Sequence, residues 1–218
     1  MRRPSGGNFG SAVPVLNRHS QICASAAFGW VPLGGLEFDL VNAVYGTRNG
    51  NNNNLNSASP FGLSTAYGSS GNSQFAFRPL ATSNGAGTGD YTIACVALLT
   101  SSSAGALSGQ DKTSGPHALL TVGSDYTGST LSGAISIAAS DGTSKAGAST
   151  ATGLLTGTPT WYVIVGVVRG GGTSAKIYVN GVDCTNTSSS VAIATISATG
   201  QSYCVGGQQG GASIAAGL

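Results

Sequence analysis

Apolar and β-branched residues occur in short runs along most of the chain, and two neighbouring runs are the most informative. Residues 161–169 read Trp-Tyr-Val-Ile-Val-Gly-Val-Val-Arg, and 175–183 read Ala-Lys-Ile-Tyr-Val-Asn-Gly-Val-Asp, with a glycine-rich segment between them. β-branched and aromatic residues favour strands. In the second run Ile177 and Val179 alternate with Tyr178, and this period of two indicates a half-buried sheet. The pattern predicts two antiparallel strands with Tyr178 on the face opposite to the two aliphatic residues.

A tight turn is predicted at Asn180-Gly181, because Asn-Gly between apolar residues is the strongest short hairpin signal. The asparagine-rich stretch 49–56 is expected to be a loop, and the small, polar stretch 141–159 is expected to hold a strand with loose ends. No run has a convincing helical period. Further strands are predicted in the apolar runs at 25–33, 60–67, 73–78, 90–100, 118–123, 133–138, 191–196 and 201–207.

The two central runs also resemble a known family. Trp161, the aliphatic strand, Arg169-Gly170-Gly171 and then Lys-Ile-Tyr-Val-Asn-Gly-Val at 176–182 resemble the central hairpin of laminin-G-like, or concanavalin-A-like, jelly-roll domains. Tyr-Thr-Ile-Ala at 91–94 and Val-Gly-Gly at 205–207 are similar to two other strands of that family. The resemblance implies an all-β fold, a two-sheet antiparallel jelly-roll sandwich.

The start of the chain resembles a narrower group. Leu-Asn-Arg at 16–18 leads into an apolar strand with Trp-Val-Pro-Leu at 30–33, then Asp-Leu-Val at 39–41 and Tyr-Gly-Thr at 45–47. This order is similar to the opening of laminin-G-like proteins encoded by tailed phages and prophages.

Length and glycine content indicate one domain preceded by an arm. A chain of 218 residues fits a single β-sandwich. Residues 1–20 are rich in Pro and Gly and are expected to be an extended N-terminal arm, and 21–218 are expected to form the sandwich. Residues 213–218 resemble the start of the family's closing strand. That strand is therefore expected to be incomplete, and either further chain or another subunit would complete it.

Charge argues against several partners. Only 7% of residues are charged and the net charge is +2, too little to indicate nucleic acid or an anionic membrane. No run approaches a membrane span, and the basic start lacks the apolar core of a signal peptide. The arm is expected to be solvated or laid on a neighbour, and its candidate partner-binding residues are Arg2, Arg3, Phe9, Val13, Leu16 and Arg18.

The four cysteines do not form a metal-binding spacing. No two lie in a Cys-x-x-Cys arrangement. Cys95 and Cys204 lie in apolar runs and are expected to be small core residues. The disulfide state of these two and of Cys23 and Cys184 is left open by the sequence.

The acidic residues do not favour catalysis or a cofactor. Glycoside hydrolysis needs a pair of carboxylates, whereas the chain has one glutamate, Glu37, and scattered aspartates. We expect no enzymatic activity. Calcium is the family's usual ion and requires several oxygen ligands, but the loop-side aspartates are expected to serve turns. They are Asp90, Asp111, Asp125 and Asp141. His19 and His117 lack the partners of a catalytic arrangement.

Exposed aromatic residues are the candidates for sugar binding. Tyr126, in a loop, is the best surface candidate and Trp30 is the second, although Trp30 and Trp161 are both expected to be core residues. The remaining aromatic candidates are Tyr45, Tyr67, Tyr162 and Tyr178.

The sequence therefore predicts contact rather than turnover. The first expectation is a structural virion protein of a tailed phage, made in the host cytoplasm. It would decorate the capsid or a head or tail fibre, form a homo-oligomer and bind the major capsid protein or a fibre protein. The alternative is a carbohydrate-binding adhesin module that recognises surface glycans. A third is a bacterial laminin-G-like domain with a protein partner. No nucleic-acid or membrane partner is expected, and fold alone does not choose among the three.

Overall fold

The computed structural model describes the backbone of residues 90–110, 116–189 and 191–194 and of eight short strands outside these ranges. Side chains are described for 90–109, 118–169, 171–189 and 191–194. Every strand pair in this part of the chain is antiparallel, and it contains no α-helix. The all-β prediction is confirmed. Within the same residues, no helix has the length and apolar character needed to span a membrane.

Two sheets form the body of the fold. The four-stranded sheet has the order β15-β14-β13-β8, and the eight-stranded sheet has the order β16-β12-β11-β10-β9-β17-β7-β4 among the described strands. The four-stranded sheet consists of β8 (Tyr91–Leu99), β13 (Thr160–Arg169), β14 (Ser174–Val179) and β15 (Val182–Asp183). The eight-stranded sheet consists of β9 (Gly105–Gln110), β10 (Pro116–Ser124), β11 (Thr130–Asp141), β12 (Lys145–Thr150), β16 (Thr185–Ser188), β17 (Tyr203–Val205), β7 (Gln74–Phe77) and β4 (Thr47–Asn49).

Two small sheets complete the described strands. One has three strands, β1 (Trp30–Leu33), β2 (Leu36–Asp39) and β3 (Val44–Tyr45). The other pairs β5 (Asn52–Leu55) with β6 (Ala66–Ser69).

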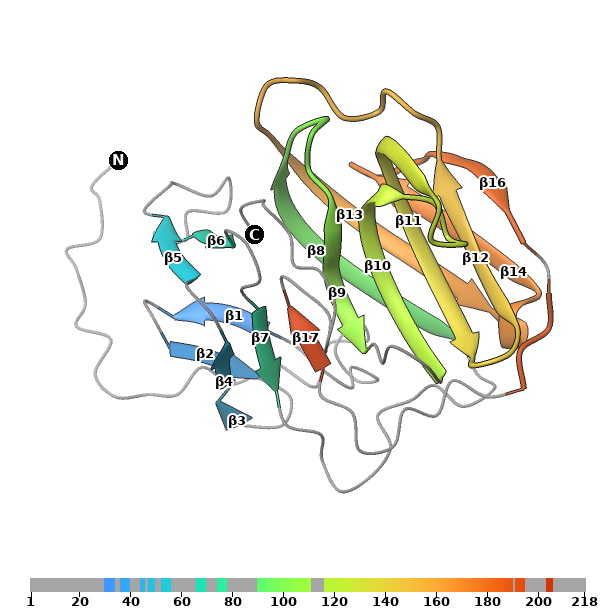
Figure 1. Cartoon of the computed structure of the whole chain (residues 1–218), viewed down its shortest axis with the longest axis horizontal. Helices are drawn as coiled ribbons and strands as arrows, with labels where there is room; N and C mark the ends of the chain where they lie inside the picture. The colour runs from blue at the N-terminus through green and yellow to red at the C-terminus, as the bar shows by residue number, and fades with distance from the viewer. Residues whose placement is uncertain are drawn as a thin grey trace, which may run out of the picture.

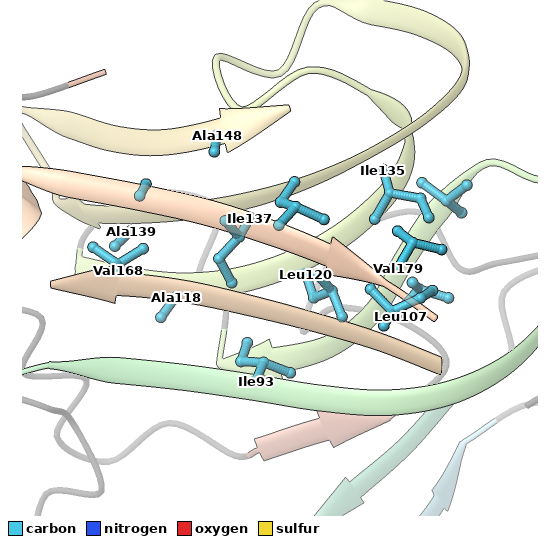
Figure 2. Close-up of a cluster of buried hydrophobic side chains, with 14 of the residues drawn as sticks. Ile93, Leu107, Ala118, Leu120, Ile135, Ile137, Ala139, Ala148, Val168 and Val179 are labelled. Atoms are coloured by element: carbon cyan, nitrogen blue, oxygen red, sulfur yellow. The ribbon is translucent and has the colours of Figure 1, made fainter. Parts of the chain in front are cut away.

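The two large sheets stack face to face as a β-sandwich. Figure 1 shows β8, β13 and β14 behind the layer formed by β9 to β12. Among the described strands, the chain passes from one large sheet to the other after β7, after β8, after β12 and after β15. Consecutive strands pair in hairpins from β9 to β12 and from β13 to β15. The core lies between the layers, where alternate residues of both sheets interdigitate. Figure 2 shows this cluster, which includes Ile93, Leu107, Leu120, Ile135, Ile137, Val168 and Val179.

Gly166 shows how closely the two sheets approach. It lies in the middle of β13, where a glycine weakens a strand unless something packs against it. A Cβ built on Gly166 would lie 2.8 Å from the Cβ of Ile137 on the opposite sheet. Ile137 itself is fully buried. The glycine therefore makes room for a large side chain from the facing layer.

The central hairpin forms as the sequence predicts. β13 pairs with β14 from Ile164↔Val179 to Arg169↔Ser174, and a single 3-10 turn at Gly170–Gly172 joins them. At the next turn Asn180 has φ 51° and Gly181 φ 82°, the left-handed values that an Asn-Gly hairpin turn requires.

Three local predictions are wrong. The expected loop at 49–56 contains β5, whose backbone pairs with β6, because strand pairing can override an unfavourable asparagine composition. Residues 191–194 of the expected strand 191–196 are irregular: they are fixed by separate bonds from Ile193 N to Gly171 O (2.7 Å) and from Ala194 N to the Oδ2 of Asp141 (2.8 Å). Trp161 is not a core residue, since the neighbouring Tyr162 occupies the core side of β13.

Candidate functional site

The outer face of the four-stranded sheet is apolar as well as the inner one. Its side chains lie in rows across the strands: Leu98 beside Trp161, Val96 beside Val163, and Ala94 beside Val165, which in turn lies beside Tyr178. We call this set the apolar face. It consists of Ala94, Val96 and Leu98 on β8, of Trp161, Val163, Val165 and Val167 on β13, and of Tyr178 on β14.

The apolar face is partly open to solvent. Ala94 and Val163 are exposed, with 40% of Val163 accessible, and the other members are half-buried. A solvated antiparallel sheet normally alternates apolar residues inside with polar residues outside, whereas strands covered on both faces have near-continuous apolar runs. β13 has such a near-continuous apolar run. This composition is typical of a strand that is covered on both faces.

One end of the apolar face is charged. Lys176 lies beside Val167 in the same row, and its Nζ lies 2.6 Å from the Oδ2 of Asp183 on β15. This hydrogen bond holds the pKa of Asp183 down to about 2, and Thr185 contributes by donating its backbone N–H to Oδ1. The same bond raises the pKa of Lys176. Both side chains are well exposed, so solvent weakens the attraction and its contribution to stability is small.

We expect the Asp183→Asn variant to be slightly less stable than the wild type at neutral pH and equally stable at low pH. The folded pKa of Asp183 is below its unfolded value, so its stabilisation is present above about pH 4 and is lost as the pH falls through about 2. Urea unfolding midpoints measured from pH 7 to 2 should show the variant slightly less stable at neutral pH. The two curves should converge near pH 2. A difference in urea midpoint that stays constant over this pH range would show that the charge of the Asp183 carboxylate contributes nothing to stability.

Asp125 and Asp141 serve turns, as the sequence predicts. The Oδ1 of Asp125 accepts bonds from Thr127 N (2.9 Å), Thr127 Oγ1 (2.6 Å) and Ser129 N (2.9 Å). Asp141 accepts from Thr143 N and Ser144 N through Oδ1 and from Ala194 N through Oδ2. These donors lower the pKa of each carboxyl, with Thr127 the main cause for Asp125 and Ala194 for Asp141.

The outer face of the eight-stranded sheet differs in kind. Residues 133–140 of β11 are buried on both sides, and the outward positions hold only alanine and serine. The hydroxyls of Thr121 and Ser136 lie 2.6 Å apart there. The turn after β10 contacts this face: Tyr126 N donates to Ser149 Oγ (2.9 Å), and Lys145 Nζ donates to Thr127 O (3.1 Å).

The sugar-binding candidates are placed as follows. Tyr126 is half-buried, with its Cβ against Gly147 of β12. Tyr162 is buried in the core, and Tyr178 belongs to the apolar face. The side chain of Trp30 lies outside the described residues, as do those of Tyr45 and Tyr67. The structure therefore does not bring Tyr126 together with a second described aromatic residue from that set.

Other candidates are separated or lie outside the described residues. Arg2, Arg3, Phe9, Val13, Leu16, Arg18, Glu37, Asp111, His19 and His117 all have side chains outside these ranges. Among the described side chains, no group of three or more His, Cys, Asp or Glu residues is placed to hold a metal ion. Cys95 and Cys184 are free thiols at the margin of the core, and burial raises the pKa of Cys95 to about 12.

Sequence reasoning missed the apolar face. The signal was present in β13, where Trp161, Val163, Val165 and Val167 are as apolar as the residues between them.

No protein-family model matches the chain, and no curated protein matches its sequence.

Proposed function

We propose that this chain is a non-enzymatic structural protein of a tailed-phage virion that binds a neighbouring subunit through the apolar face. The neighbour would be the major capsid protein or a fibre protein. The observation that carries the proposal is an apolar outer face on a sheet that also has an apolar core face. The resemblance of the sequence to laminin-G-like jelly-roll domains, and its phage-like opening with the arm expected at residues 1–20, support the choice of a virion.

The size of the apolar face suits contact with a larger surface. The face covers residues 94–98 of β8, 161–167 of β13 and Tyr178 of β14. With strands about 4.8 Å apart and about 3.4 Å per residue, its area is about 200 Å². Monomeric proteins rarely expose a continuous apolar patch larger than a few hundred Å². A stable interface buries about 800 Å² on each partner. The face would thus form the centre of an interface, and further contacts such as those of the arm would enlarge it.

The centre of such an interface is its most sensitive part. Val163 is the most exposed large residue of the apolar face and lies in its middle rows, between Val96 on β8 and the turn at Asn180. Burying a charge at this point without a counter-charge would cost far more than the lost apolar contact. A single substitution there is therefore expected to prevent binding.

We expect Val163→Lys to raise the dissociation constant of the chain from virion particles at least about tenfold, which corresponds to a loss of about 1.4 kcal/mol or more in binding free energy. The measurement is co-sedimentation of the chain with particles in a density gradient. Val182→Lys is the matched control: Val182 is 63% exposed, lies on β15 opposite Val179 and is not part of the apolar face. It should bind as the wild type does.

Two results would overturn the proposal. A wild-type chain that stays free of particles would exclude a virion role. Equal binding by Val163→Lys and Val182→Lys would exclude the apolar face as the contact. Circular dichroism of both variants would first establish that each retains the β-sheet signal.

The carbohydrate-binding alternative has less support. It depends on Tyr126 and Trp30, and the side chain of Trp30 lies outside the described residues. The side chain of Tyr126 is half-buried against β12, whereas sugar stacking needs an open aromatic ring.

A further inference from the structure

The turn that joins β14 to β15 consists of two residues with a reactivity of their own. They are Asn180 and Gly181, and both are exposed. The side-chain amide of an asparagine can be attacked by the backbone nitrogen of the next residue. Glycine favours this attack because it has no Cβ to hinder the approach. The surroundings are also open, since a Cβ built on Gly181 would have no atom within 4 Å. The turn is therefore a candidate site of spontaneous chemical modification.

The reaction is deamidation, and its co-reactant is water. The backbone nitrogen of Gly181 loses its proton and forms a bond to the Cγ of Asn180, while the side-chain amino group takes up a proton and leaves that carbon as ammonia. The product is a five-membered succinimide ring. Water then opens the ring at one of its two carbonyls. Opening at Cγ gives aspartate, and opening at the main-chain carbonyl gives isoaspartate, which has one more carbon in the main chain.

Two hydrogen bonds to Val163 hold Asn180 in a conformation that blocks this reaction. Asn180 N donates to Val163 O (2.8 Å), and Val163 N donates to the Oδ1 of Asn180 (2.9 Å). The φ of Asn180 is 51°, in the left-handed region where ψ is about +47°. At such a ψ the nitrogen of Gly181 lies nearly opposite the Cβ of Asn180 across the Cα–C bond. The ring needs these two atoms on the same side, so the closed turn does not react.

Opening of the turn would remove both obstacles. β15 has two residues, Val182 and Asp183, and both are exposed. It pairs with β14 through Val179↔Val182 and Tyr178↔Asp183. Elements with few buried contacts open locally at a lower free energy than the whole protein unfolds. In the open turn the backbone of Asn180 is free to rotate, and its side chain is released from Val163.

We propose that Asn180 is a deamidation site which the closed hairpin protects and which local opening of the hairpin exposes. The inference goes beyond the proposed function, since it concerns the isolated chain and holds whatever the chain binds. Isoaspartate would make the change permanent, because a turn lengthened by one carbon no longer fits the register of a two-residue hairpin. It would also place a carboxylate beside Val163, the most exposed large residue of the apolar face.

The test is peptide mapping of the full chain during incubation at neutral pH. Isoaspartate at Asn180 is measured by mass spectrometry over time, in buffer and in guanidinium chloride that unfolds the chain. We expect it to form in both solutions, and at least about tenfold more slowly in buffer, because only the open fraction reacts there. The mapping separates Asn180 from the two other Asn-Gly pairs, Asn49-Gly50 and Asn84-Gly85.

Val182→Gly tests whether opening of the hairpin sets the rate. Glycine weakens a strand, so this variant should form isoaspartate at Asn180 about threefold to fivefold faster than the wild type in buffer. Its rate in guanidinium chloride should equal that of the wild type, since no hairpin remains there. Val191→Gly is the matched control: Val191 is also an exposed valine and lies outside the hairpin. Its rate in buffer should stay within about twofold of the wild type.

Three results would overturn the proposal. Equal rates for the wild type in buffer and in guanidinium chloride would show that the hairpin does not protect Asn180. Isoaspartate that forms in guanidinium chloride and in neither the wild type nor Val182→Gly in buffer would show that the turn does not open. Equal rates for Val182→Gly and Val191→Gly in buffer would show that the hairpin does not control the reaction. The first comparison needs no variant, and none of these results affects the particle-binding test with Val163→Lys.

Discussion

Replacing Ile137 by alanine is expected to lower the free energy of unfolding by about 2–5 kcal/mol. Ile137 is fully buried on β11 and packs into the space that Gly166 leaves on the facing sheet. Truncation removes apolar contacts with both layers and leaves a cavity. The backbone at Gly166 cannot fill it without separating β13 from its neighbours β8 and β14. Urea denaturation monitored by circular dichroism would measure the loss.

Ile137→Val is the control for this experiment. It removes one methylene and should cost about 0.5–1.5 kcal/mol. If alanine were no more costly than valine, Ile137 would not be the contact that fills the space between the sheets, and the described packing would be wrong at this point.

Replacing Gly147 by alanine is the second substitution for which we expect a large effect. A Cβ at this position would overlap the carbonyl oxygen of Ile137 and would lie 2.6 Å from the Cβ of Tyr126. Neither obstacle is the flexible end of a side chain, so β12 or the turn at Tyr126 must move. We expect a loss of about 1–3 kcal/mol, the usual cost of overpacking.

Gly157→Ala provides the matched control. Gly157 lies in the exposed connection between β12 and β13, and a Cβ there would have no atom within 4 Å. Its effect should be within about 1 kcal/mol and in the stabilising direction, because alanine restricts the unfolded chain. Equal urea midpoints for the Gly147 and Gly157 variants would show that the turn at Tyr126 does not pack against β12.

The Gly147 result also bears on the role of Tyr126. If Gly147→Ala moves the turn as expected, the contact of Tyr126 with β12 is structural and the residue is less suited to an exposed sugar site. The hydrogen bond from Tyr126 N to Ser149 Oγ gives a second point of attachment for the same turn. Packing and hydrogen bonding therefore both assign this turn to the outer face of the eight-stranded sheet.

Clear alternation in the sequence led to correct predictions. Ile177 and Val179 are buried while Tyr178 lies on the other face, because only one assignment of the two faces removes the aliphatic side chains from water. The Asn180-Gly181 turn was equally predictable, since few residues other than these adopt its backbone conformation.

In a strand that is apolar on both faces, the sequence pattern does not indicate which face is buried. In β13, Trp161 and Tyr162 are both suitable core residues, and the expectation that Trp161 is buried was wrong. The choice depends on the facing sheet: Gly166 must lie opposite Ile137, which sends the even-numbered residues inward and leaves Trp161 on the outer face. Tyr126 was similarly predicted as a loop residue, but its contact with Gly147 depends on β12, some twenty residues further along the chain.

The sequence by itself determined that the chain forms antiparallel strands, where its central hairpin turns, and which face of β14 is buried. These are consequences of local backbone preference and of a period of two, both of which act between near neighbours. Only the tertiary structure decided which side of β13 faces the core and that an apolar face lies on the outer side of its sheet. Those features depend on contacts between residues far apart in the chain, which no local pattern records.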